Sequence, residues 1–227
     1  MNHILVPATD AEDWKRLLAD PEKHWRKGYS ARTLAHCWQE ANGFPREIEQ
    51  LFSDSKFSAF RGIELLFAIP EHKVPLPGGS RPSQNDLFVL ARAQEQLIAI
   101  TVEGKVAEPF GPTIEEWIAE ASPGKERRLA FLKELLGLPE KISSKIRYQL
   151  LHRSVSALLE AFRFNAPIAV MIVHSFSQEN QWLDDYQVFL ETFGVRAAID
   201  QLVFVIENRG VSLYCGWAKG NAKYLEV

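Results

Sequence analysis

The sequence contains little cysteine and no long apolar run, and these two shortages exclude several classes of protein. Two cysteines, Cys37 and Cys215, stand among 227 residues. They fit neither a disulfide framework nor the paired spacing of a zinc site, so we expect two reduced, buried thiols. No apolar stretch approaches the ~20 residues of a membrane helix. Residues 1–18 lack the basic and apolar segments of a signal peptide. We therefore expect a cytoplasmic protein without a membrane segment.

The chain also lacks a large excess of charge of either sign. The 26 Lys and Arg residues are balanced by 29 Asp and Glu residues, for a formal net charge of −3. Such a protein binds an anionic partner only through a local patch. Residues 125–153 carry eight basic and three acidic residues, which predicts a surface for nucleic acid, DNA or RNA. An ordinary solvated helix face is the alternative. The predicted contacts are Lys145, Arg147, Arg153 and, in an earlier Pro/Gly-rich loop, Arg81.

The order of the predicted elements defines an α/β fold. Residues 8–57 have helical patterns, and three strand-length apolar runs follow at 62–70, 86–93 and 96–106. Helices, a strand over 167–176, another helix and a hairpin turning at 208–210 complete the chain. We expect a mixed sheet flanked by helices. An N-terminal helical layer, residues 1–60, is predicted to pack on a core of residues 61–227 within a single domain.

A charged triplet ends the third predicted strand. Alternation places Glu103 and Lys105 on one face of that strand, with Gly104 between them pointing away. A tight turn near residues 94–96 would bring Asp86, at the start of the preceding strand, beside the triplet. Carboxylates with water and substrate phosphate satisfy Mg²⁺, and a lysine can orient the attacking water. A polar strand tip without chemistry is the alternative.

The segment NDLFVLARAQEQLIAITVEGKV, residues 85–106, resembles the PD-(D/E)XK nuclease superfamily. The resemblance extends over roughly residues 60–176 and implies a restriction-endonuclease-like fold. It implies Mg²⁺ or Mn²⁺ held by Asp86 and Glu103. Because glycine leaves room where the strand crosses the site, we expect the peptide oxygen of Gly104 as a further ligand. Lys105 would be the catalytic amine. Asn85 stands where the family usually has proline. The chain is identified as a member of an uncharacterised bacterial branch.

Two further positions are predicted to join this site. Glu64 is an acid within an apolar run, where burial is costly unless the carboxylate is paired or coordinating. Glu71 competes with it but follows Pro70 in an expected turn, and a solvent-facing acid is the alternative for Glu64. On the long helix after the motif, Gln149 shares a face with His152 and Arg153. The resemblance implies a site role for Gln149, since some members of that superfamily carry a Gln on a helix packed over the site; a solvated polar face is the alternative.

Other functions remain open from the sequence alone. A non-catalytic binding or assembly module with a nuclease-type core is the main alternative, and a homo-oligomer is compatible with the hydrophobic content. A serine hydrolase using Ser175 and His174 lacks the expected Gly-x-Ser-x-Gly turn. The segment HWRKGYS, residues 24–30, is aromatic and basic, and we interpret it as a partner surface or a packed turn between helices.

Overall fold

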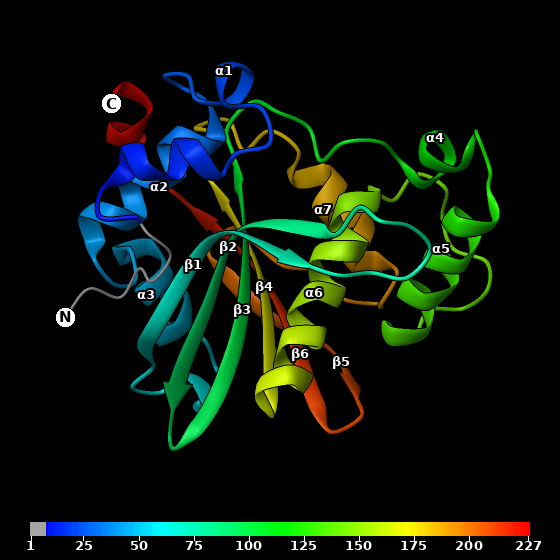
Figure 1. Ribbon diagram of the computed structural model, residues 1–227. Coiled ribbons are helices and arrows are strands. Elements are labelled where there is room, and N and C mark those ends of the chain that lie inside the picture. Colours follow the sequence, from blue (N-terminus) through cyan, green and yellow to red (C-terminus); the bar gives the residue numbers. More distant parts are fainter. Residues whose placement is uncertain (1–7) are drawn as a thin grey trace.

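The computed structural model describes residues 8–227, and its centre is a six-stranded sheet in the order β1-β2-β3-β4-β6-β5 (Figure 1). The first three strands form an antiparallel meander, β4 is parallel to β3 and β6, and β5 pairs antiparallel with β6. The predicted α/β class with a mixed sheet and flanking helices is confirmed. The strands are β1 Glu64–Val74, β2 Ser83–Ala93, β3 Gln96–Lys105, β4 Ile168–Ser175, β5 Gln201–Asn208 and β6 Val211–Lys219.

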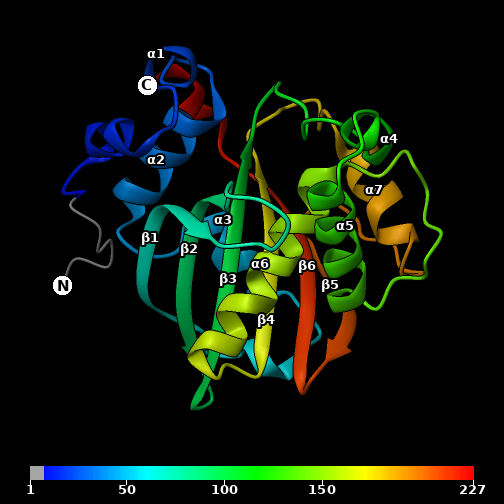
Figure 2. The ribbon, with the colours of Figure 1, turned by 45° about the vertical axis from the view of Figure 1, so that its right-hand side comes forward.

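Helices cover both faces of this sheet. Two N-terminal helices pack on one face, while a long helix crosses the other with two further helices beside it (Figure 2). The first layer holds α2 (Ser30–Ala41) and α3 (Arg46–Ser53), and the second holds α5 (Pro123–Leu135), α6 (Tyr148–Phe164) and α7 (Leu183–Glu191). Residues 1–7 of the predicted N-terminal layer lie outside the described residues. The shorter helices are η1 Ala11–Leu17, α1 Pro21–His24, η2 Ser58–Phe60, α4 Ile114–Ile118 and η3 Ala222–Glu226.

The sheet is buried on both faces, which explains why its central strands are apolar at nearly every position. On β3, Ile98 and Ile100 contribute to the core beneath the N-terminal helices, and Ala99 contributes to the core beneath α6. The cysteines Cys37 and Cys215 are free and buried, as expected. None of the helices between residues 8 and 227 combines the length and the apolar character that crossing a membrane requires.

The β2–β3 hairpin turns at Gln94-Glu95, both of which have positive φ. Ala93 pairs with Gln96, and the ladder ends with Leu87 opposite Val102. This register differs by one residue from the one expected, because the turn holds two residues rather than three. Two successive positive φ values are typical of the tight turns whose twist matches that of the strands. The start of β2 still lies beside the end of β3.

β1 is longer at its C-terminal end than the sequence suggested. The prediction ended it at Pro70, but the strand continues to Val74. β1 is the edge of the sheet, where a proline does not interrupt a ladder on its open side. A positive φ of 51° at Glu71 bends the strand directly after the proline. The extension places Glu71 inside the sheet, between the pairs Pro70–Leu87 and His72–Asn85.

The long helix α6 begins only at Tyr148, although Ser143 and Ser144 before it are residues that often cap a helix. Arg147 forms a β-bridge with Thr113, and the amide of Tyr148 donates to the carbonyl of Pro112. These contacts keep the chain extended up to residue 147, so the helix starts only after them. The delay fixes the rotation of α6 over the sheet and therefore which side chains face β3.

Candidate functional site

Lys105 is the centre of a buried polar cluster at the C-terminal end of β3. Its Nζ lies 2.6 Å from Glu103 Oε1 and donates to Gln149 Oε1 at 3.2 Å. The ammonium also lies 4.9 Å from the centroid of the Phe110 ring. Glu103 and Lys105 point toward α6, as alternation predicts, while the position of a Cβ on Gly104 would face Leu34 of α2. Gln149 therefore reaches the site from α6, as the sequence indicated.

Asp86 joins the cluster from β2. Its Oδ2 accepts a 2.8 Å hydrogen bond from the amide of Gly104. The ladder between β2 and β3 has ended at Leu87, so this side chain takes the place of the next backbone partner. The structure thus brings Asp86, Glu103 and Lys105 together as the hairpin predicts. The peptide of Gly104 lies beside the Asp86 carboxylate.

Glu71, not Glu64, is the third carboxylate of this region. Glu71 Oε2 accepts a 2.6 Å hydrogen bond from Gln84, and both residues line the same pocket as Asp86 and Glu103. Glu64 lies at the opposite end of β1 and pairs with Arg92 at 2.9 Å, where both side chains are more than half exposed. The prediction that Glu64 joins the site is therefore corrected, since the antiparallel register carries it away from Asp86.

Arg153 lies between the carboxylates of Glu103 and Asp86, and the sequence did not assign it to their cluster. Its Nε donates to Glu103 Oε2 at 2.5 Å, and its Nη2 is 3.9 Å from Asp86 Oδ1. Its Nη1 donates to the hydroxyl of Ser83. The whole residue is only 6% exposed and lines the pocket, so Arg153 does not belong to the open basic surface, and its contact with nucleic acid stays a prediction. One turn of α6 separates it from Gln149, and this i, i+4 spacing was its sequence signal.

Burial and like charges separate the pKa values of the three carboxyl groups. Burial and then the neighbouring Asp86 raise the pKa of Glu71 to about 8. Burial and then Glu103 raise the pKa of Asp86 to about 7. Burial also acts to raise the pKa of Glu103, but Arg153 and Lys105 outweigh it and hold that pKa below its ordinary value. Glu103 is therefore the anion that the two cations neutralise.

His152 supports Arg153 from the same turn of α6. Its Nδ1 lies 2.8 Å from Ser83 Oγ and 3.4 Å from Arg153 Nη1. Arginine only donates, so Nδ1 is the unprotonated nitrogen. Burial, followed by the charge of Arg153, lowers the pKa of His152 well below its ordinary value. His152 is thus a neutral acceptor that orients the arginine.

The other predicted nucleic-acid contacts do not line the pocket. Arg147 is tied down by an ion pair with Asp185 at 2.9 Å and by a hydrogen bond to the carbonyl of Gly111. Its guanidinium also lies over the ring of Trp182. It therefore holds the loop before α4 and the start of α7 in place. Lys145 and Arg81 are exposed and stay predictions.

A cavity of about 360 Å³ opens onto the cluster. Its walls come from three parts of the chain: the N-terminal segment, the strands β1 to β3 with the loop that follows, and α6. Six lining residues form the site group, Glu71, Asp86, Glu103, Lys105, Gln149 and Arg153, and the lining also includes His24, Ser30 and Glu108.

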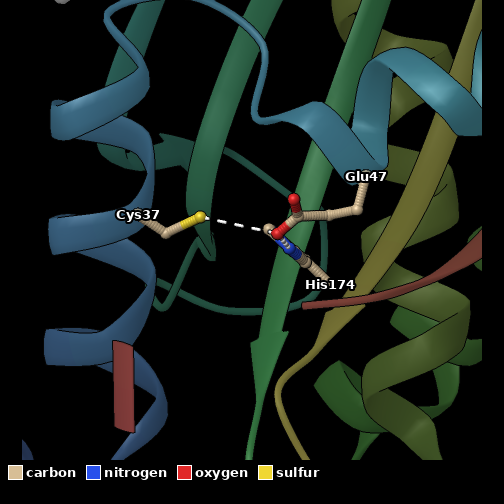
Figure 3. Close-up of side chains that lie close together, drawn as sticks. All are labelled: Cys37, Glu47 and His174. Atoms are coloured by element: carbon tan, nitrogen blue, oxygen red, sulfur yellow. Dashed lines mark hydrogen bonds and ion pairs between the residues drawn. The ribbon is translucent and has the colours of Figure 1, made fainter. Parts of the chain in front are cut away.

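A second cluster of potential metal ligands lies on the other face of the sheet. Cys37 of α2, Glu47 of α3 and His174 of β4 point toward one another (Figure 3). His174 Nδ1 accepts from the indole of Trp38 at 3.1 Å, and Nε2 lies 2.9 Å from Glu47. An indole nitrogen only donates, so Nε2 carries the proton and donates to Glu47.

This proton assignment does not suit a metal centre. A metal on Nε2 would leave a proton on Nδ1, facing the indole N–H, whereas metal-bound histidines normally donate that proton to an acceptor. Burial raises the pKa of the Cys37 thiol far above its ordinary value, which disfavours the thiolate. We interpret the cluster as a hydrogen-bond network that fastens α2 and α3 to β4.

The alternative of a Ser175–His174 hydrolase has no geometric basis. The two residues are neighbours on β4, so their side chains point to opposite faces of the sheet. Both are completely buried, and His174 is already engaged with Trp38 and Glu47. No substrate reaches such a pair.

The fold and the cluster of Asp86, Glu103 and Lys105 define an α/β protein with an acid–lysine pocket at the end of a buried strand. The chain belongs to a family described as a domain of unknown function (DUF6946), whose model matches residues 7–222. No curated protein and no solved structure gives a significant match.

Proposed function

We propose that the protein is a Mg²⁺- or Mn²⁺-dependent phosphodiesterase that hydrolyses DNA or RNA. The observation that carries this proposal is the meeting of Asp86, Glu103 and Lys105 on one face of two paired strands, at the bottom of a pocket. Two carboxylates and an amine in this relation supply a cation site and a positioned proton donor or acceptor.

The order of the elements gives further support. A three-strand antiparallel meander is followed by α6 and by β4 parallel to β3. This is the succession that a PD-(D/E)XK core would have, with Asp at the start of the second strand and Glu-x-Lys on the third. We therefore propose a restriction-endonuclease-like core for residues 61–227, with the N-terminal layer added to one face.

The residues of the pocket fit a hard divalent cation. The site holds three carboxylates and two cationic side chains, which leaves an excess of one negative charge when all are ionised. The donors are carboxylate oxygens, which Mg²⁺ and Mn²⁺ prefer. Asp86 and Glu103 would hold the ion, with Glu71 and the Gly104 peptide next to them. When bound, the ion activates water and offsets charge on a phosphoryl group.

The chain's own residues divide the remaining work. Lys105 presents its ammonium within the pocket and is held in place by Glu103 and Gln149, so it can orient water or stabilise negative charge. Gln149 fixes the lysine without adding charge. Arg153 keeps Glu103 ionised and adds a second positive charge toward an incoming phosphate.

Arg153 also favours the second candidate, a non-catalytic binding or assembly module. Both oxygens of Glu103 are engaged, one by Lys105 and one by Arg153. In this arrangement a guanidinium neutralises the carboxylate that a cation would otherwise neutralise. A nuclease-type core that has lost its metal would retain such an internal ion pair.

Cleavage assays on labelled DNA and RNA with Mg²⁺, with Mn²⁺ and with EDTA test the two candidates. We expect metal-dependent cleavage by the wild type and its loss in Lys105→Ala, with the folded state preserved in thermal melts. Glu64→Ala is the matched control, because that exposed acid lies at the other end of β1. Equal integrity of both substrates with wild type and Lys105→Ala would leave the binding module as the better candidate.

A further inference from the structure

The reactive side chains of the site group are withdrawn into a half-open recess at the end of β3, here named the chamber. Glu103 and Lys105 are only 2% and 4% exposed. The cavity above them, about 360 Å³, is at the small end of the ~300–1,000 Å³ typical of ligand pockets. A continuous duplex is a rod wider than this recess, so only a part of it as small as one nucleotide can enter. A single nucleotide fits this space.

The outer wall of the chamber is fastened to the sheet. Glu108, in the loop after β3, accepts a 2.8 Å hydrogen bond from the amide of Ser30 and a 3.2 Å bond from the amide of Val106. Ser30 is the first residue of α2. One carboxylate thus joins the N-terminal layer to the strand that carries the site. This link keeps the N-terminal segment over the pocket.

The same segment carries an aromatic and basic surface next to the pocket wall. His24 and Ser30 line the cavity, and Tyr29 precedes Ser30 with its side chain exposed. The guanidinium of Arg26 lies 5.9 Å from the centroid of the Tyr29 ring. Exposed rings beside cations are how proteins hold unpaired bases without reading their sequence. This gives residues 24–30, unusual already in the sequence, a role at the mouth of the chamber.

We propose that the pocket accepts one unpaired nucleotide at a time, and that its substrate is single-stranded nucleic acid. A base stacks on Tyr29 at the mouth while Arg26 and His24 meet the backbone, and the adjoining phosphate enters the chamber. The inference rests on the proposed function, since it names the substrate of the same site. It also explains why the reactive side chains are buried.

Binding measured without turnover tests this inference. Fluorescence anisotropy in EDTA compares single-stranded DNA, single-stranded RNA and duplex DNA of one length. We expect a single strand to bind at least about tenfold more tightly than the duplex, and Tyr29→Ala to weaken that binding by about tenfold, near the lower end of the range for one stacked base. Tyr29→Phe keeps the ring and should bind as the wild type does. The tighter of the two single strands identifies the sugar.

Phe204→Ala is the matched control, because Phe204 is an aromatic residue of similar exposure, 40% against 37% for Tyr29, on the edge strand β5. Its binding should equal that of the wild type. Duplex binding as tight as single-strand binding, or no effect of Tyr29→Ala, would overturn the inference. Absence of cleavage with Mg²⁺ or Mn²⁺ would instead overturn the proposed function, while selective binding of single strands would still stand.

Discussion

The amide of Gly104 donates a 2.8 Å hydrogen bond to the carboxylate of Asp86. This contact joins the start of β2 to the end of β3, and the two together form one site. It forms where the β2–β3 ladder stops, so the aspartate side chain replaces a backbone acceptor. The bond leaves the other oxygen of Asp86 facing Arg153 and the pocket. The spacing of carboxylate, peptide and lysine is therefore set by the sheet itself.

Gly104→Ala should disturb this contact directly. A Cβ at residue 104 would lie 3.3 Å from Leu34 Cδ2 and 3.4 Å from Asp86 Oδ2, both tighter than or at the limit of ordinary contact. Overpacking of this kind costs about 1–3 kcal/mol, so we expect a lower free energy of unfolding in urea. Gly43→Ala is the control, since its Cβ would meet only Ala41 O at 3.7 Å. Equal stability of the two variants would contradict the assigned crowding.

Arg153→Leu should destabilise the protein by removing the partner of a buried anion. Breaking one side of a buried ion pair typically costs about 3–5 kcal/mol, and we expect a loss at the lower end of that range because Lys105 still pairs with Glu103. We expect Mg²⁺ to recover part of this loss, since a cation can replace the guanidinium beside Glu103. Urea unfolding with and without Mg²⁺ measures both effects. Indifference of Arg153→Leu to Mg²⁺ would count against a cation site.

The Glu47–His174–Trp38 network should be structural and indifferent to metal. Glu47→Gln changes the acceptor of the His174 Nε2 proton, and we expect a loss of about 1–3 kcal/mol in unfolding free energy. Catalysis and single-strand binding should not change, because the network lies on the opposite face of the sheet. Zn²⁺ should not raise the melting temperature of the wild type. A Zn²⁺-dependent rise that disappears in Cys37→Ser would reverse this interpretation.

His152 should make the fold sensitive to acid. Its folded pKa is depressed, so the unfolded chain takes up a proton near its ordinary value of ~6.5 while the folded chain does not. Stability due to the neutral imidazole is therefore present above about pH 6.5 and is lost as the pH falls below it. His152→Gln should lose less unfolding free energy than the wild type between pH ~7 and ~5. An identical loss in both proteins would contradict the buried neutral state.

The β2–β3 hairpin, and the face of it that carries the charged side chains, could be predicted from local sequence pattern. Alternation alone put Glu103 and Lys105 on one face, and the short turn placed Asp86 beside them. The error over Glu64 has a specific cause, namely that Pro70 was taken as the end of β1. On an edge strand a proline is tolerated, and the strand continued through Glu71 into register with the start of β2.

Local pattern placed Arg153 on the helix face of Gln149 but could not show which carboxylate it meets. Its ion pair with Glu103 depends on where α6 begins, and that is set by the contacts of residues 146–148 with Pro112 and its neighbours. A basic residue in a positively charged stretch resembles a surface contact until the rotation of the helix is known. The role of Glu108 has the same origin, because it joins segments 78 residues apart in the sequence.

Calorimetric titration of the protein with Mg²⁺ and with Mn²⁺, repeated on Asp86→Asn, tests the central claim most directly. Asparagine retains an oxygen that can accept from the Gly104 amide while removing the negative charge, so the fold is expected to survive. We predict heat of binding in the wild type, at least about tenfold weaker binding in Asp86→Asn, and an unchanged isotherm in Glu64→Gln. A wild-type protein that gives no heat and no thermal shift with either ion would contradict a metal-dependent phosphodiesterase.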